Sequence, residues 1–159
     1  MSTRAASAAD ARRVGVTLEG PRAPVSASRL AAAVRDVLRA EGVRAAMISV
    51  TLVPERTIAR LNRRHLAHRG PTDVIAFGFS PSPGAPVVGD IYICPEVARR
   101  NARSAGCGVR EELLRLAVHG TLHVLGWEHP ADAGREESPM WRRQERLLAA
   151  VRRREARRT

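Results

Sequence analysis

Residues 110–125 read Arg-Glu-Glu-Leu-Leu-Arg-Leu-Ala-Val-His-Gly-Thr-Leu-His-Val-Leu, and this stretch constrains how the rest of the chain can fold. Its apolar residues recur at intervals of three and four, the spacing of one helix face, which carries Leu113, Leu116 or Ala117, and Val124. No other apolar-periodic segment of the sequence is as long. We therefore expect one long helix here, with that face against the core.

The same stretch carries two histidines, His119 and His123, four residues apart. On a helix this spacing places both imidazoles on one face, with Cβ atoms about 5–6 Å apart, so both can reach one metal ion. Gly126 is expected to end the helix, because glycine adopts the left-handed conformation without steric cost. The chain can then turn and bring back His129 as a third ligand.

Three neutral imidazoles with an open fourth position are typical of a catalytic zinc site. Imidazole also suits nickel, copper and iron, so the residues themselves leave the identity of the metal open. In zinc proteases with this histidine spacing, the residue after the first histidine is a glutamate that serves as general base. Here that residue is Gly120, which has no group to move a proton. A phosphodiester depends less on such a base where a metal and nearby cations stabilise the developing charge.

Around this helix the sequence predicts an α+β fold: one domain, with a mixed sheet of about four strands packed with about five helices. Alternating or continuous apolar runs predict strands at 14–18, 47–53, 73–79 and 87–94. Helical spacing, with a serine, proline or glycine at the ends, predicts helices at 26 or 28 to 41, 54–64, 95–105, 110–125 and from about 136 to 151. Residues 14–151 are then the domain, 1–13 a disordered basic tail and 152–159 a frayed, solvated basic tail.

The chain is strongly basic, with a net charge of +11 at pH 7, and all 27 of its basic residues are arginine. This balance favours an anionic partner, with nucleic acid the leading candidate. The alternative is a basic protein that has no such partner.

Cys94 and Cys107 do not form a disulfide framework and lack the spacing of a metal motif, which suggests reduced thiols in a cytoplasmic protein. We expect neither a membrane span nor a signal peptide, because no apolar run is long enough.

Several segments together resemble the YbeY-type endoribonucleases, the bacterial rRNA maturation factors. The similarity extends over residues 47–148, about two thirds of the chain. It rests on four segments in the family's order: Leu61-Asn62 followed by Pro-Thr-Asp-Val-Ile-Ala-Phe at 71–77, Gly-Asp-Ile-Tyr-Ile at 89–93, the histidine segment at 119–129, and Met140 with Glu145.

The resemblance implies one zinc ion held by His119, His123 and His129. It implies cleavage of single-stranded RNA, maturation of the 3′ end of small-subunit rRNA and a role in ribosome quality control. It also implies association with the small ribosomal subunit, whereas a membrane or DNA is not an expected partner.

One departure from the family concerns a substrate-binding arginine. The family commonly has an aromatic residue and an arginine four and five residues after the leucine of Leu-Asn, where this chain has His65 and Leu66. That arginine is a favoured candidate for binding the substrate phosphate. Arg64 and Arg69 are the candidates to replace it, near the cleft, as catalytic residues.

A second departure lies before the third histidine, where the family usually has aspartate and this chain has Glu128. Glu128 is the third candidate catalytic residue, because it can orient a histidine or a water beside the metal. It is equally consistent with a solvated loop acid.

Other residues have two interpretations each. Thr72 and Asp73 line the cleft or stabilise a turn, and Asp90, which opens a strand after Gly89, is interpreted as structural. Trp127 and Trp141 stack on bases or anchor the core, and the low aromatic content of 3% favours the core.

Two other function classes remain open. A zinc protease shares the histidine spacing, although Gly120 argues against it. A non-catalytic ribosome-assembly or RNA-binding factor with a structural zinc is favoured by Leu66 in place of the family's arginine.

Overall fold

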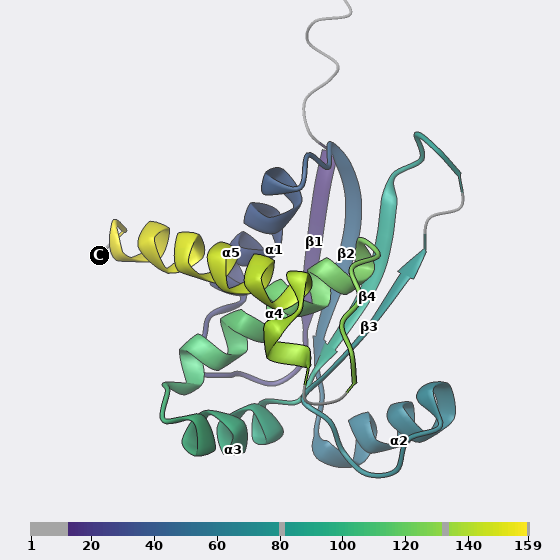
Figure 1. The fold of residues 1–159 in the computed structure, drawn as a ribbon, viewed down its shortest axis with the longest axis vertical. Helices are drawn as coiled ribbons and strands as arrows, with labels where there is room; N and C mark the ends of the chain where they lie inside the picture. Colours follow the sequence, from purple (N-terminus) through teal and green to yellow (C-terminus); the bar gives the residue numbers. More distant parts are fainter. Residues whose placement is uncertain (1–12, 80–81, 132–133, 159) are drawn as a thin grey trace, which may run out of the picture.

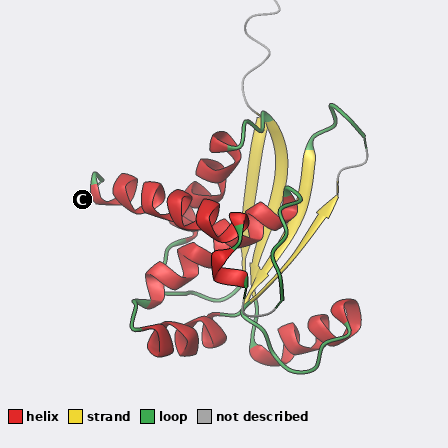
Figure 2. Ribbon diagram, in the orientation of Figure 1, coloured by secondary structure: helices red, strands yellow, loops and turns green. Residues whose placement is uncertain are grey.

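The computed structural model describes residues 13–79, 82–131 and 134–158. In these residues a single domain of α+β class forms, as predicted, with helices and strands that follow each other without strict alternation (Figures 1 and 2). The elements are β1 (Arg13–Glu19), α1 (Ala27–Ala40), β2 (Ala45–Leu52), α2 (Glu55–Leu66), β3 (Val74–Phe79), β4 (Val87–Ile93), α3 (Pro95–Ala105), α4 (Val109–Val124), the 3₁₀ turn η1 (Arg135–Glu137) and α5 (Pro139–Ala156).

The four strands form one mixed sheet in the order β1-β2-β4-β3. β1, β2 and β4 are parallel, whereas β3 lies antiparallel to β4 at the edge. The prediction of a mixed sheet is therefore confirmed. The strand register places Gly78 opposite Gly89, and Met47 beside Val88.

The two faces of the sheet differ in how they are covered. Along β2, every second residue from Ala46 to Leu52 is buried, whereas Met47 on the other face is 66% exposed. In Figure 1, α1, α3, α4 and α5 lie together on one side of the strands, and α2 lies apart near the lower end of β3. Ile58 of α2 packs with Ile75 and with the partly buried Phe77 and Tyr92 in a second, smaller cluster. The main core therefore lies on one face of the sheet, with α4 at its centre.

α4 is buried almost all round, because it contacts the sheet through β3 and β4 and also contacts α1, α3 and α5. From Glu112 to Val124 every residue is buried except Arg115 and His123. This is more extensive than the single apolar face expected from the sequence, because other helices cover the faces that the sheet does not.

Glycines allow α4 to approach the sheet closely. A Cβ atom at Gly120 would lie 2.7 Å from Cγ2 of Ile91 in β4. A Cβ atom at Gly78 would lie 2.5 Å from the carbonyl oxygen of Val124, and one at Gly89 would overlap the Val124 side chain. The cross-strand glycine pair therefore forms a shallow seat for the C-terminal end of α4.

Some predicted positions are confirmed in the structure, and some boundaries differ. Gly89 and Asp90 lie inside β4, within the strand predicted at 87–94, and Asp90 accepts a hydrogen bond of 2.6 Å from the Ser49 hydroxyl of the neighbouring strand. The last helix begins at Pro139, where the Ser138 hydroxyl accepts from the Trp141 amide and caps it. Serine is a favoured residue at this position.

α5 also continues beyond the predicted end of the domain at residue 151. Arg152 pairs with Glu111 of α4 at 2.5 Å, and Arg154 pairs with Asp36 of α1. Cationic side chains near a helix C-terminus also interact favourably with the helix dipole. Residues 152–156 are thus helical rather than frayed, whereas the tail predicted at 1–13 lies outside the described residues except for Arg13. Within the described ranges, no helix combines the length and the apolar character that crossing a bilayer requires.

The glycine seat leads to a stability prediction. Gly78→Ala is expected to lower the free energy of unfolding by roughly 1–3 kcal/mol, because the added methyl overlaps the backbone of α4. Urea denaturation with an unchanged slope measures the loss. Gly15→Ala is the matched control in the same sheet, since its Cβ would have no atom within 4 Å, and a change within about 0.5 kcal/mol is expected there. Equal losses of stability in the two variants would show that the close approach of Gly78 to α4 is not the cause of the destabilisation.

Candidate metal centre and adjoining cavity

The three histidines of the predicted site come together at the C-terminal end of α4. His119 and His123 project from the helix, and the chain reverses at Gly126, which has φ of +96°. The amide of Gly126 bonds to the carbonyl of His123 at 2.9 Å, and the amide of Trp127 bonds to the carbonyl of Leu122 at 3.0 Å. These two bonds form a Schellman motif, which satisfies the last carbonyls of a helix. The reversal returns His129 to the same place, as predicted.

The spacing of the three imidazoles fits one metal ion. One nitrogen from each ring lies within 4.8 Å of the others, and the Nε2 atoms of His123 and His129 are 3.1 Å apart. In a tetrahedral site with metal–nitrogen bonds of about 2.0–2.1 Å, neighbouring nitrogens are about 3.3–3.4 Å apart. The observed separation is close to that value.

Hydrogen bonds at the opposite ring nitrogens set the direction of each ligand. Each Nδ1 atom lies beside an oxygen: Gln144 Oε1 at 2.5 Å for His119, the Trp127 carbonyl at 2.9 Å for His123, and the Pro130 carbonyl at 2.8 Å for His129. These oxygens can only accept, so each Nδ1 carries the proton and each Nε2 keeps a lone pair. Facing lone pairs repel unless a cation lies between them, so the donor set itself fits a metal ion.

Burial favours the neutral form of His119 and of His123. Desolvation lowers the pKa of His119 to about 3, although its bond to Gln144 opposes this shift. Burial also lowers the pKa of His123, and the nearby His129 lowers it further. A histidine must be unprotonated to bind a metal, and the low pKa means that no proton has to be displaced at neutral pH.

A network behind His119 holds Gln144 in one orientation. Gln144 lies on α5 and is 1% exposed. Its Nε2 donates to Glu145 at 3.1 Å, and the Arg115 guanidinium donates to both oxygens of Glu145. Because Glu145 can only accept, the amide nitrogen of Gln144 faces it and the amide oxygen faces His119. α4 and α5 are thus linked through His119, one of the three predicted metal ligands.

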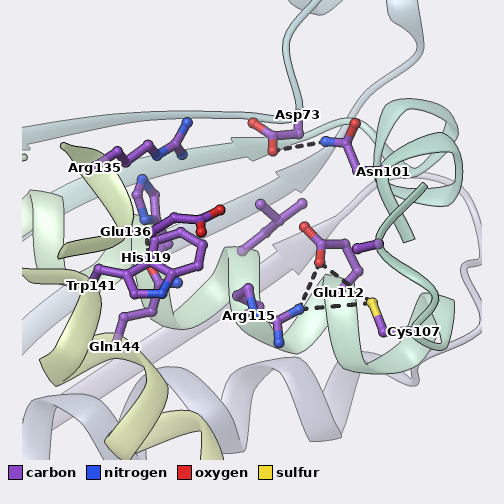
Figure 3. Close-up of a pocket in the computed structure, with 12 residues that line it drawn as sticks. Asp73, Asn101, Cys107, Glu112, Arg115, His119, Arg135, Glu136, Trp141 and Gln144 are labelled. Atoms are coloured by element: carbon purple, nitrogen blue, oxygen red, sulfur yellow. Dashed lines mark hydrogen bonds and ion pairs between the residues drawn. The ribbon is translucent and has the colours of Figure 1, made fainter. Parts of the chain in front are cut away.

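A cavity of about 390 Å³ adjoins His119 (Figure 3). In the view of Figure 3, Arg135, His119 and Trp141 lie on one side, and Asp73 and Asn101 lie above. The positive charge of Arg135 is one of the causes that lower the pKa of His119 and of His123. Its Nε atom is buried and has no hydrogen-bond partner among the described residues. Arg135 is therefore the arginine that the structure places beside the predicted ligands.

The three predicted catalytic residues lie elsewhere or at the margin of the site. Arg64 is exposed on α2, and Arg69 lines a separate hollow of about 640 Å³ on the surface of α2. Neither lines the cavity beside His119. Glu128 is exposed, and its charge raises the pKa of His123 in opposition to burial. Their catalytic roles stay predictions.

The structure also explains why position 120 is a glycine. Its missing side chain would point at Ile91 in the sheet, so no acid at this position could reach a substrate at the metal without displacing α4. This position belongs to the packing of α4 and not to the chemistry of the site.

Two residues of the site were missed by the sequence analysis. Gln144 follows Met140 by four residues and precedes Leu147 and Leu148 by three and four, so it lies on the apolar face of α5. A polar residue on an apolar face needs a buried partner, and this signal could have identified Gln144. Arg135 had no such signal, because it is one of many arginines.

The network leads to a prediction for metal binding. Gln144→Leu leaves the Nδ1–H of His119 without an acceptor, and metal affinity is expected to fall about 10- to 100-fold, the usual effect of losing such a partner. A competition titration with a chromophoric chelator measures the affinity. Gln144→Glu keeps an acceptor and is the control, expected to retain tight binding. An unchanged affinity in folded Gln144→Leu would show that this bond does not support the ligand.

Comparison with known proteins gives the same family as the sequence motifs. Residues 18–152 match the family model described as Endoribonuclease YbeY. A protein of that name from Parafrankia is 39% identical over 137 residues, covering 79% of this chain and 84% of the relative. One from Thermobifida fusca is 40% identical over 134 residues, with 79% and 84% covered.

The fold has a counterpart among solved structures. The solution structure of a Thermotoga maritima protein superposes with a TM-score of 0.55 at 26% identity and covers 86% of this chain and 88% of that protein. The match to the family model over most of the chain and the identity of the relatives show that this chain belongs to the YbeY family of endoribonucleases.

Proposed function

We propose that this protein is a zinc-dependent endoribonuclease that cuts single-stranded RNA in the cytoplasm and matures the 3′ end of small-subunit rRNA. The observation that carries the proposal is the convergence of three imidazoles, each with Nδ1 on an oxygen acceptor, in a chain of an endoribonuclease family. Zinc is favoured because three histidines with an open position are typical of catalytic zinc.

The three histidines and Arg135 have separate roles in this proposal. When bound, zinc would act as a Lewis acid and lower the pKa of a water molecule in its open position. His119, His123 and His129 would hold it through Nε2. Arg135 binds a phosphate oxygen of the RNA and offsets negative charge as the reaction proceeds. This role is the one that the family's usual arginine would have at Leu66, which here is 47% exposed at the end of α2.

The distribution of arginines supports RNA as the substrate. Several arginines are neutralised in ion pairs, such as Arg115 with Glu112 and Arg143 with Glu41. By contrast, the exposed hollow on α2 is lined by four arginines that form no ion pair with another described residue: Arg56, Arg60, Arg63 and Arg69. An unpaired cluster of guanidinium groups suits a phosphate backbone. We further propose that this protein associates with the small ribosomal subunit and acts in ribosome quality control.

Leu66 favours one alternative, a non-catalytic assembly factor that binds RNA and uses the metal to tie the His129 segment to α4. A protease is disfavoured, because Gly120 is packed against the sheet.

The proposed activity predicts a metal-dependent cut. The zinc-loaded wild type is expected to cleave a short single-stranded RNA covering the 3′ end of small-subunit rRNA, and to leave the same sequence intact in a duplex. A chelator should abolish cleavage and added zinc should restore it, because the ligands are otherwise intact. Denaturing gel electrophoresis of end-labelled RNA measures the rate.

His123→Ala is the matched variant, and it is expected to lose both bound zinc and cleavage while remaining folded. Metal content is measured in parallel by atomic emission. If a folded, zinc-loaded wild type binds this RNA and never cuts it, the nuclease proposal is wrong and the assembly-factor function is favoured.

A further inference from the structure

The cavity beside His119 has room for one nucleotide base. Its volume is about 390 Å³, and sites for small ligands begin at roughly 300 Å³. It opens between α3, α4, η1 and α5, at the start of β3 (Figure 3). Since His119 lines it, a base in the cavity would belong to a nucleotide next to a phosphate at the metal centre.

The polar wall of the cavity offers mainly hydrogen-bond acceptors. Asp73 accepts from Nδ2 of Asn101 at 3.1 Å and from the Thr72 hydroxyl at 3.4 Å. An ionised carboxylate has about four acceptor positions, so acceptors remain free at Asp73. Neither Asp73 nor the exposed Glu136 is paired with an arginine in the described part of the chain. Two unpaired acids beside the active centre are unexpected in a protein of charge +11.

The donors of the deeper wall are already used. Arg115 donates to Glu112 at 2.8 Å and to Glu145 at 3.1 and 3.3 Å. This leaves Arg135, beside the histidines, as the arginine available to the phosphate. Trp141 contributes an aromatic surface to the same cavity. Aromatic side chains stack on any base, so Trp141 would add affinity without selecting among bases.

We propose that this cavity is a base-binding subsite, and that its carboxylates select a base with an exocyclic amino group. The subsite rests on the proposed function, because it serves the RNA cut at the metal centre. Cytosine and uracil provide the sharpest contrast. The 4-amino group of cytosine donates to a carboxylate, as acidic side chains do in reading this base. The 4-oxo group of uracil presents a lone pair to the same carboxylate and would be repelled.

The test compares oligocytidylate and oligouridylate of equal length, so that no cleavage position has to be known. For the zinc-loaded wild type we expect kcat/KM to be at least about tenfold higher with oligocytidylate, because a hydrogen bond to a charged acceptor discriminates by about that factor or more. Binding of the two RNAs to the metal-free protein, measured by fluorescence anisotropy, should show the same preference without any cutting.

Three variants identify the group responsible. Asp73→Asn removes the negative charge and replaces one acceptor oxygen by an NH2 donor, which can bond to the 4-oxo group of uracil, so the ratio between the two RNAs should fall to about one or below. Asp90→Asn makes the same change on the opposite face of the sheet and should keep the wild-type ratio. Trp141→Leu should weaken the binding of both RNAs alike and leave the ratio between oligocytidylate and oligouridylate unchanged. Circular dichroism confirms that each variant is folded.

The outcomes separate the subsite from the nuclease proposal. Equal cleavage and equal binding of the two RNAs by wild type would overturn the subsite while the nuclease stands. A cytidine preference that persists in Asp73→Asn would also overturn it. If neither RNA is cut but the binding preference is present and is lost in Asp73→Asn, the subsite stands and the nuclease proposal fails.

Discussion

The close approach of α4 to the sheet is the constraint on which the site depends. Gly78 and Gly89, paired across β3 and β4, leave room for Val124, and Gly120 leaves room for Ile91. A helix one methyl farther from the strands would carry the three histidines away from Asp73, which lines the cavity beside His119 at the start of β3. Packed interiors do not adjust to such changes without strain, so the position of the histidines relative to the sheet follows from the glycines.

Once α4 is fixed, α5 completes the centre from the other side. Gln144 reaches His119 from within the core, and Glu145 and Arg115 keep its amide oriented. A buried polar chain of this kind is stable only when every member is satisfied. The same residues that join α4 to α5 therefore also determine which nitrogen of His119 is free to bind a metal ion.

Charge is distributed unevenly around this centre. Arginines that form no ion pair with another described residue gather on and just after α2, whereas Asp73 and Glu136 line the cavity beside His119. The first arrangement suits any phosphate backbone, and the second suits particular base edges. Affinity and selectivity for RNA would then reside in different parts of the molecule, and Arg135 would connect them at the scissile phosphate.

The order of strands and helices, the mixed sheet and the convergence of three histidines that could hold a metal ion all followed from the sequence by itself. Apolar spacing and glycine positions are local signals, and His119, His123 and His129 lie within eleven consecutive residues. Only the tertiary structure placed Gln144 and Arg135 at the site, paired Asp90 with Ser49 of the neighbouring strand, and turned Gly120 toward Ile91. These contacts join segments far apart in the chain, and residue type does not specify which of many arginines or acids folding will bring together.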